Sequence, residues 1–305
     1  MVKVKDISAH INVIIIMAIY AFAFYPQIIT AQSKKAFLVG ISNYESTDSE
    51  DAWPTIHGTN DVELISATLK HQGFKTKMLQ DKQATANKIR KELKSFSLSL
   101  HDGDMVYLHF SCHGQPFEDS APFDEEDGWD ESLIPYDAKM TYSEESYDGT
   151  NHLLDDELYE YFSSIRKSIG PDGFLCVVID ACHAGGSSRG NESENDGVFV
   201  RGTGKGFSST GKIYRPRINT NGHFHLSPSS ELAHIVILEA CRSYQSNYEI
   251  KEEGSYYGPL SYYVNQVFQK QIQINNINWV QEVKKLMDAD IRLVRQNMVY
   301  ETSLE

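Results

Sequence analysis

Cysteine and positive charge are both scarce in this chain of 305 residues. Four cysteines are far fewer than the dense disulfide framework of a small secreted domain, so at most one bridge is expected. The 28 lysines and arginines are outnumbered by 42 aspartates and glutamates, which gives a formal net charge of -14. Because clustered Lys and Arg hold nucleic acid and anionic membrane surfaces, this balance argues against both as partners and favours a basic substrate. The 41% apolar content supplies an ordinary globular core, and no internal repeat is visible.

One long uncharged run stands near the N-terminus. Lys3 and Lys5 precede residues 11–31, INVIIIMAIYAFAFYPQIITA, and a cleavage position is present near Ala31. A basic start followed by an apolar middle is the layout of an export signal, and about 20 apolar residues are also enough to cross a bilayer. We therefore expect residues 1–32 to be a signal peptide or a retained N-terminal membrane anchor. Either places the remainder outside the cytoplasm, exported to the periplasm or the extracellular space, or held at the membrane by that segment.

Continuous apolar runs alternate with helical spacing along the rest of the chain. Strands are expected at 35–44, 75–79, 104–110, 174–180 and 233–240, and helices at 60–72, 84–98, 155–169, 259–269 and 279–295. This alternation predicts an α/β fold with a mainly parallel central sheet and helices on both faces. An acidic loop is expected at 118–137, and a long Gly-, Ser- and Asn-rich loop or insertion at 185–230.

Two short motifs follow the ends of predicted strands. One is HFSCHG, which ends at Gly114, and the other is VVIDACHAGG at 177–186. Because chemistry in such sheets gathers at the carboxyl ends of the strands, His113 and Cys182 can meet in space. A cysteine attacks a carbonyl as the thiolate, and a nearby histidine can generate that thiolate and then protonate the leaving amine. The backbone N–H groups of Gly114 and Cys182 are candidate donors for an oxyanion hole.

Two other interpretations of these residues stay open. A cysteine near a strand end is often a small buried hydrophobe. A zinc site could instead combine Cys112 and His113 with Cys182 and His183. Adjacent residues of an extended chain point to opposite sides, so only one ligand from each pair could share a face, and no metal is predicted here.

With these motifs placed, the chain resembles the caspase-like clan of cysteine peptidases, and most closely its bacterial, metacaspase-type members (orthocaspases). HFSCHG and VVIDACHAGG carry the resemblance together, and it extends from about Lys35 to beyond Tyr262. Supporting stretches are HGTNDVELISATLKHQGF, EEDGWDESLIPYDA, NHLLDDEL and ACRSYQSNYE. The resemblance implies a caspase-like three-layer sandwich at 33–305, with a large-subunit-like part (33–184), a linker (185–230) and a small-subunit-like part (231–305). It also implies a monomeric cysteine endopeptidase, a hydrolase of proteins or peptides, with Cys182 as nucleophile and His113 as general base and acid.

The residue two positions before the nucleophile separates this chain from animal caspases. In metacaspase-like enzymes an acid there, and the Asp of an early Asn-Asp motif, line the specificity pocket and bind Arg or Lys. The matching positions here are Asp180 and Asp61. Two carboxylates attract a guanidinium and repel the aspartate that animal caspases take, so we predict cleavage after Arg or Lys. Cleavage after Asp, or a catalytically silent module that binds partners in the same cleft, are the alternatives, and Asp61 also suits a helix N-cap.

The linker offers targets for such a peptidase. Its basic residues are Arg189, Arg201, Lys205, Lys212, Arg215 and Arg217. An enzyme that cuts after basic residues could therefore process its own linker, although a solvated basic loop would have the same composition.

Calcium is the cofactor that the resemblance raises. Some metacaspases bind it through acids near the counterparts of Asp155 and Asp156 and through a further acid shortly after the nucleophile. Here that stretch reads AGGSSRGN, with Ser and Arg in place of an acid, and a hard cation needs several oxygens at once. No cofactor is therefore expected to be required. Asp155 and Asp156 are kept as weak calcium candidates that also suit a helix cap.

Overall fold

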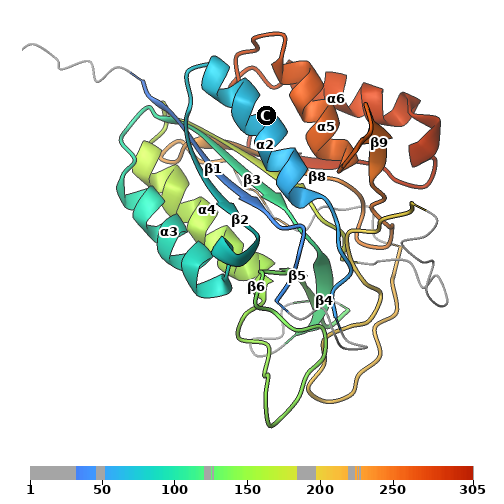
Figure 1. Ribbon diagram of the computed structural model, residues 1–305. Coiled ribbons are helices and arrows are strands. Elements are labelled where there is room, and N and C mark those ends of the chain that lie inside the picture. The colour runs from blue at the N-terminus through green and yellow to red at the C-terminus, as the bar shows by residue number, and fades with distance from the viewer. Residues whose placement is uncertain are drawn as a thin grey trace, which may run out of the picture. The chain divides into compact units, whose positions relative to one another are not determined.

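Six strands form the central sheet of the computed structural model (Figure 1). From edge to edge they are β11 (Val299–Thr302), β8 (His234–Glu239), β7 (Phe174–Asp180), β3 (Met105–Ser111), β1 (Lys34–Gly40) and β2 (Lys75–Gln80). All neighbours are parallel except β11, which pairs antiparallel with β8. The structure describes residues 32–45, 52–119, 125, 127–183, 197–218, 224, 226 and 228–304.

The N-terminal expectation falls almost entirely outside these ranges. Of the expected signal peptide or anchor, only Gln32 is described. Within the ranges given above, no helix is both long enough and apolar enough to span a bilayer.

The inner strands are buried on both faces. Every residue of β3 and of β7 is buried. Leu108 and Val177 belong to one hydrophobic core, whereas their neighbours Tyr107 and Val178 belong to the other. Since successive side chains of a strand point to opposite faces, a strand between two cores is mainly apolar, which explains the long apolar runs in the sequence.

Helices cover the two faces separately, as Figure 1 shows. On one face lie α3 (Ala86–Leu98) and α4 (Asp155–Ile169), and on the other lie α2 (Gly58–His71), α5 (Pro259–Phe268) and α6 (Asn278–Ala289). Each helix turns an apolar stripe to the sheet, as with Ile89 and Leu93 of α3 or Ile65 and Leu69 of α2. The expected α/β architecture, three layers around a mainly parallel sheet, is confirmed.

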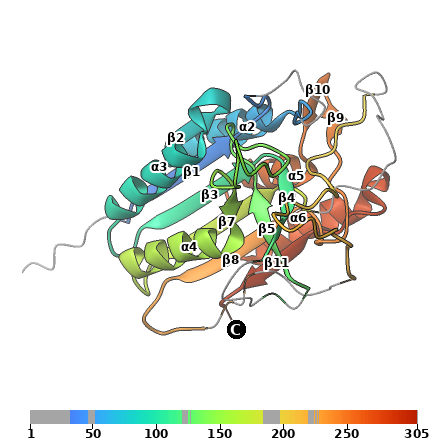
Figure 2. The same ribbon diagram turned by 90° about the horizontal axis from the view of Figure 1, so that it is seen from below.

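Short strands lie beyond the carboxyl ends of the central strands (Figures 1 and 2). The segment expected to be an acidic loop at 118–137 instead includes β5 (Trp129–Leu133). It pairs antiparallel with β4 (Gly114–Glu118) and with β6 (Leu153–Leu154). The acidic pair in the middle of β5 separates its apolar end residues, so the sequence shows no apolar run there.

The C-terminal part also differs from expectation. β9 (Ile250–Glu252) and β10 (Ser255–Tyr257) form a small antiparallel hairpin that was not predicted. The last helix ends at Ala289 rather than near residue 295, because Asp290 is extended and its side chain accepts a hydrogen bond from the Arg292 N–H. The chain then passes through a single 3-10 turn into β11.

Candidate active site

The two predicted catalytic residues lie beyond neighbouring strand ends. Ser111 at the end of β3 pairs in register with Asp180 at the end of β7, so His113 and Cys182 each stand two residues past the same rung of the sheet. Both side chains are buried. A Cβ placed on Gly114 would lie 2.6 Å from the Cys182 carbonyl oxygen, so the two segments meet backbone to backbone.

The His113 ring is fixed by three neighbours. Trp53 stacks on it with ring centroids 5.0 Å apart, and the Tyr44 hydroxyl oxygen accepts the His113 backbone N–H at 2.8 Å. Its Nε2 lies 2.8 Å from the Pro54 carbonyl oxygen. Because a carbonyl only accepts, Nε2 must carry the proton, and the neutral ring keeps its lone pair on Nδ1. That atom is buried without a hydrogen-bond partner among the described residues.

Burial also sets the charge of this ring. It lowers the pKa of His113 to about 4, with the Pro54 carbonyl acting weakly in the opposite direction. The imidazole is therefore neutral near pH 7.

Cys182 lies beside a second thiol. Its Sγ donates to the Gln245 carbonyl oxygen at 2.8 Å. A hydrogen bond with Cys182, together with burial, raises the pKa of Cys241 well above its ordinary value. All four cysteines are within the described part of the chain, and each is a buried thiol rather than half of a disulfide.

An arginine from the linker is inserted between the predicted specificity acids. Arg201 is fully buried, with Nη1 2.7 Å from Asp61 Oδ2 and Nη2 2.8 Å from Glu249 Oε1. Asp180 Oδ1 is farther away, at 3.8 Å from Nη1. We call Asp61, Asp180 and Glu249 the acidic pocket. It contains both acids predicted for specificity and one that was not predicted.

The pocket carries more negative than positive charge. Burial alone would lower the pKa of Arg201, but Asp61, Glu249 and Asp180 together raise it above its ordinary value. Burial raises the pKa of Asp61 to about 7, although Arg201 opposes that shift. For Glu249, Arg201 and His57 overcome the effect of burial and lower the pKa below its ordinary value. Three acids thus surround one guanidinium.

The two predicted specificity acids play different parts. Asp180 Oδ2 accepts the N–H and the hydroxyl of Ser261, both at 2.7 Å, and Oδ1 accepts Asn247 Nδ2 at 2.7 Å. It therefore braces the pocket wall as well as adding charge. Asp61 is buried inside the first turn of α2, which begins at Gly58 without a side-chain cap, so the N-cap interpretation of Asp61 is wrong.

The backbone of Arg201 is held as firmly as its side chain. Its carbonyl oxygen accepts the Cys182 N–H at 2.9 Å and the Gly114 N–H at 3.2 Å. Its own N–H donates to the Asn247 carbonyl oxygen at 3.0 Å. At the next residue, a Cβ on Gly202 would lie 1.9 Å from the Cys182 carbonyl oxygen, so a residue without a side chain is required for this close approach.

The other described basic residues of the linker lie elsewhere. Lys205 Nζ is 2.8 Å from the Thr141 hydroxyl, and Lys212 Nζ is 2.6 Å from the Gly128 carbonyl oxygen. Arg215 and Arg217 are exposed, and Arg189 lies outside the described residues. Its charge alone does not distinguish Arg201 from these five.

Three contributors were missed by the sequence reasoning. Glu249 and Asn247 belong to the stretch ACRSYQSNYE, which carries the resemblance but was given no role. Pro54 acts only through its carbonyl oxygen, which any residue would supply, so its side chain leaves no signal.

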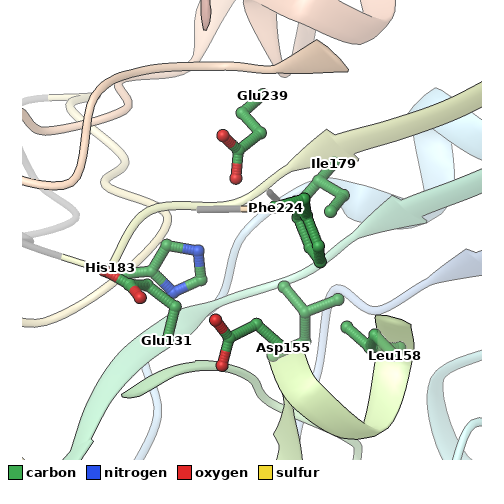
Figure 3. A pocket seen from close by; sticks show the side chains of 8 residues that line it. Glu131, Asp155, Leu158, Ile179, His183, Phe224 and Glu239 are labelled. Carbon is green, nitrogen blue, oxygen red and sulfur yellow. The ribbon is translucent and has the colours of Figure 1, made fainter. Parts of the chain in front are cut away.

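The two calcium candidates differ in their exposure to solvent. Asp155 is buried and shares a small pocket with Glu131, His183 and Glu239, and Figure 3 shows these three carboxylates around the His183 ring. Asp156 is exposed. Both belong to the first turn of α4, where they suit the helix dipole, but its N-cap residue is Leu154, so the cap interpretation is wrong.

Across the described ranges, no three or more His, Cys, Asp or Glu side chains are arranged to hold a metal ion. Residues 184–196, which follow the predicted nucleophile, lie outside those ranges.

Known proteins are similar to this chain in sequence or in fold. Residues 33–298 match the family model described as a caspase domain (Peptidase_C14). Metacaspase-1A of Neurospora crassa is 30% identical over 163 residues, which cover 50% of this chain and 32% of the relative. Metacaspase-1 of Candida albicans is 22% identical over 296 residues, which cover 84% of this chain and 62% of the relative. The chain therefore spans less than two thirds of the length of either curated relative.

Solved structures agree on the fold. A Geobacter sulfurreducens protein, GSU0716, aligns with a TM-score of 0.59 at 18% identity, over 88% of this chain and 93% of its own. Caspase-1 from Spodoptera frugiperda aligns with a TM-score of 0.50 at 14% identity, over 89% and 88%. Since the family model covers most of the sequence, the chain belongs to the caspase family of cysteine-type endopeptidases, which are hydrolases.

Proposed function

We propose that this protein is an endopeptidase that cleaves proteins and peptides after arginine or lysine, with Cys182 as nucleophile and His113 as general base and acid. The observation that carries the proposal is the placement of Arg201. Its guanidinium lies in the acidic pocket while its carbonyl oxygen accepts the N–H groups of Gly114 and Cys182. A substrate residue just before the cut would need the same two sets of contacts.

Nδ1 of His113 takes the proton of the Cys182 thiol, while Nε2 stays hydrogen-bonded to the Pro54 carbonyl oxygen. The thiolate attacks the carbonyl carbon, and the N–H groups of Gly114 and Cys182 stabilise the negative oxygen that forms. His113 then protonates the leaving amine, which leaves a thioester on Cys182. Water, deprotonated by the same histidine, hydrolyses the thioester and restores the thiol.

The acidic pocket favours arginine over lysine. The two Nη atoms of Arg201 meet different carboxylates, Asp61 and Glu249. A planar guanidinium can bridge two acids in this way, whereas a lysine ammonium places its charge at a single point.

A peptide series tests the substrate class. The full-length chain is given fluorogenic peptides that differ only in a final Arg, Lys or Asp, with added calcium and with a chelator. We expect the Arg peptide to be cleaved fastest, the Lys peptide more slowly, and the Asp peptide at least about 100-fold more slowly than Arg, because an acid in this pocket would face three carboxylates. The chelator should not reduce the rate.

Two other outcomes would change the proposed function. Preferred cleavage after Asp would overturn the role of the acidic pocket. No cleavage of any peptide, even after the linker is nicked, would favour a catalytically silent module that binds partners in this cleft.

We also propose that the linker is cut between Arg201 and Gly202. Incubation of the purified chain should yield a fragment whose new N-terminus is Gly202, identified by intact mass and N-terminal sequencing. Arg201→Gln should leave this bond intact, because a neutral amide cannot replace a guanidinium between buried carboxylates. Arg217→Gln is the matched control, since Arg217 is exposed in the same linker, and it should be cut as wild type. An uncut wild-type chain with full peptidase activity would contradict self-processing.

Three sequence-based expectations stay proposals: export or membrane anchoring by residues 1–32, a monomeric state, and independence of any cofactor.

A further inference from the structure

Aromatic rings surround Phe199, which lies two residues before Arg201. Its ring centroid is 4.6 Å from that of His57 in an edge contact, and 4.7 Å from that of Tyr256. His57 and Tyr256 stack on each other with centroids 5.0 Å apart. The two rings thus present two aromatic walls to one side chain of the linker.

We propose that His57 and Tyr256 form a subsite that selects an aromatic side chain two residues before the basic residue of a substrate. The inference rests on the proposed function, because it treats the linker as the first substrate of the cleft. The predicted substrate has an aromatic residue, then any residue, and then the arginine after which it is cut.

Backbone pairing fixes the register of this subsite. The Glu249 N–H donates to the Phe199 carbonyl oxygen, and the Arg201 N–H donates to the Asn247 carbonyl oxygen, both at 3.0 Å. Val200 forms an antiparallel bridge with Tyr248 between them. Such an added strand is recognised through its main chain, so the same pairing is open to any extended peptide. Because side chains alternate along a strand, residues 199 and 201 of the linker share a side.

The walls of the subsite are held by contacts of their own. Glu249 accepts the His57 backbone N–H at 2.7 Å and lies 2.6 Å from His57 Nδ1. The Tyr256 carbonyl oxygen accepts Asn60 Nδ2 at 3.0 Å. Glu249 therefore borders both the aromatic subsite and the acidic pocket, and it fixes the spacing between them. Both rings also have a contact other than Phe199, because they stack on each other, which suits a site for exchangeable substrates.

Paired peptides test the preference with the self-cleaved enzyme. The values of kcat/KM are compared for Val-Phe-Val-Arg, Val-Leu-Val-Arg and Val-Ala-Val-Arg, each carrying the same fluorophore. We expect Phe to exceed Ala by about tenfold and to exceed Leu clearly, because an aromatic ring gains edge and stacking contacts beyond its apolar area. Tyr256→Ala should bring the three values together while the Ala peptide is still cleaved. Tyr257→Ala, the next residue of the same strand, should keep the preference.

A second measurement does not depend on catalysis. In Cys182→Ala, whose linker stays uncut, hydrogen exchange at the Arg201 amide reports how firmly the linker is paired. Adding Phe199→Ala should speed that exchange about tenfold, because the aromatic contacts of the linker are lost. Val198→Ala is the control, since its side chain is 40% exposed, and it should leave the exchange rate unchanged.

The outcomes separate the two proposals. Equal cleavage of the Phe, Leu and Ala peptides by wild type overturns the aromatic subsite and leaves the basic preference standing. If no peptide is cleaved, faster exchange in Phe199→Ala supports the subsite as a peptide-binding site while the proposed enzymatic function fails. If no peptide is cleaved and exchange is also unchanged, both proposals are overturned.

Discussion

Cys182→Ala is expected to lose at least about 10⁴-fold in kcat toward Arg-ending peptides and to leave the linker uncut, because removal of a covalent nucleophile leaves only binding and oxyanion contacts. Hydrolysis of the fluorogenic Arg peptide and the fragment pattern of the chain are the two measurements. Thermal unfolding of the variant should show a folded protein, since a single small buried group has been removed.

The neighbouring thiol supplies the matched control. Cys241 is buried beside Cys182, and its hydrogen bond with Cys182 and its burial raise its pKa, so it stays protonated and is a poor nucleophile. Cys241→Ala should therefore retain activity within about tenfold of wild type, because it removes packing and one hydrogen bond beside the nucleophile but leaves the nucleophile itself in place. Activity that survives Cys182→Ala but disappears in Cys241→Ala would show that Cys241, and not Cys182, is the nucleophile.

Glu249→Gln is expected to reduce selectivity for arginine by about 100-fold, because it removes one charge from a buried ion pair and leaves a bound guanidinium less well compensated. The measurement is the ratio of kcat/KM for an Arg-ending peptide to that for the same peptide ending in Gln. The neutral peptide gains nothing from the charge, so its rate should change little. The fall in the ratio should appear mainly as a higher KM for the Arg peptide.

Two further variants define what that result means. Glu253→Gln removes an exposed acid from the β9 to β10 turn and should leave the ratio unchanged, which excludes a general effect of net charge. Asp180→Asn disturbs the hydrogen bonds to Ser261 and Asn247 and should lower stability as well as selectivity. An unchanged ratio in Glu249→Gln would show that Glu249 does not contribute to the selectivity for arginine.

The central sheet could be predicted because its inner strands are mainly apolar on both faces. β3 and β7 appear in the sequence as largely apolar runs, and the motifs that follow them placed His113, Gly114 and Cys182 at one edge. The hairpin of β9 and β10 and the edge strand β11 could not be predicted in this way. They are short, and their residues are only partly buried, so composition does not distinguish them from loops.

The residue that fills the acidic pocket could not be predicted from the sequence, for a different reason. Asp61 and Asp180 follow recognisable motifs, but Glu249 joins them through the path of a loop that tertiary packing determines. Arg201 is one of six basic residues in the linker, and only the pairing of residues 199–201 with 247–249 selects it. Local sequence encodes the charge of the occupant, and the fold determines which residue it is.

The covalent continuity of Arg201 with Cys182 has a kinetic consequence. In the proposed self-processing, cleavage at Arg201 is unimolecular, so its half-life should not depend on protein concentration and dilution should not slow it. A separate substrate meets the opposite situation, because before the cut it competes with a tethered segment whose effective concentration is set by the chain rather than by the solution. On this proposal the uncut protein processes itself at a rate independent of its concentration, and it acts on other substrates as a second-order catalyst only after its own strand has left the cleft.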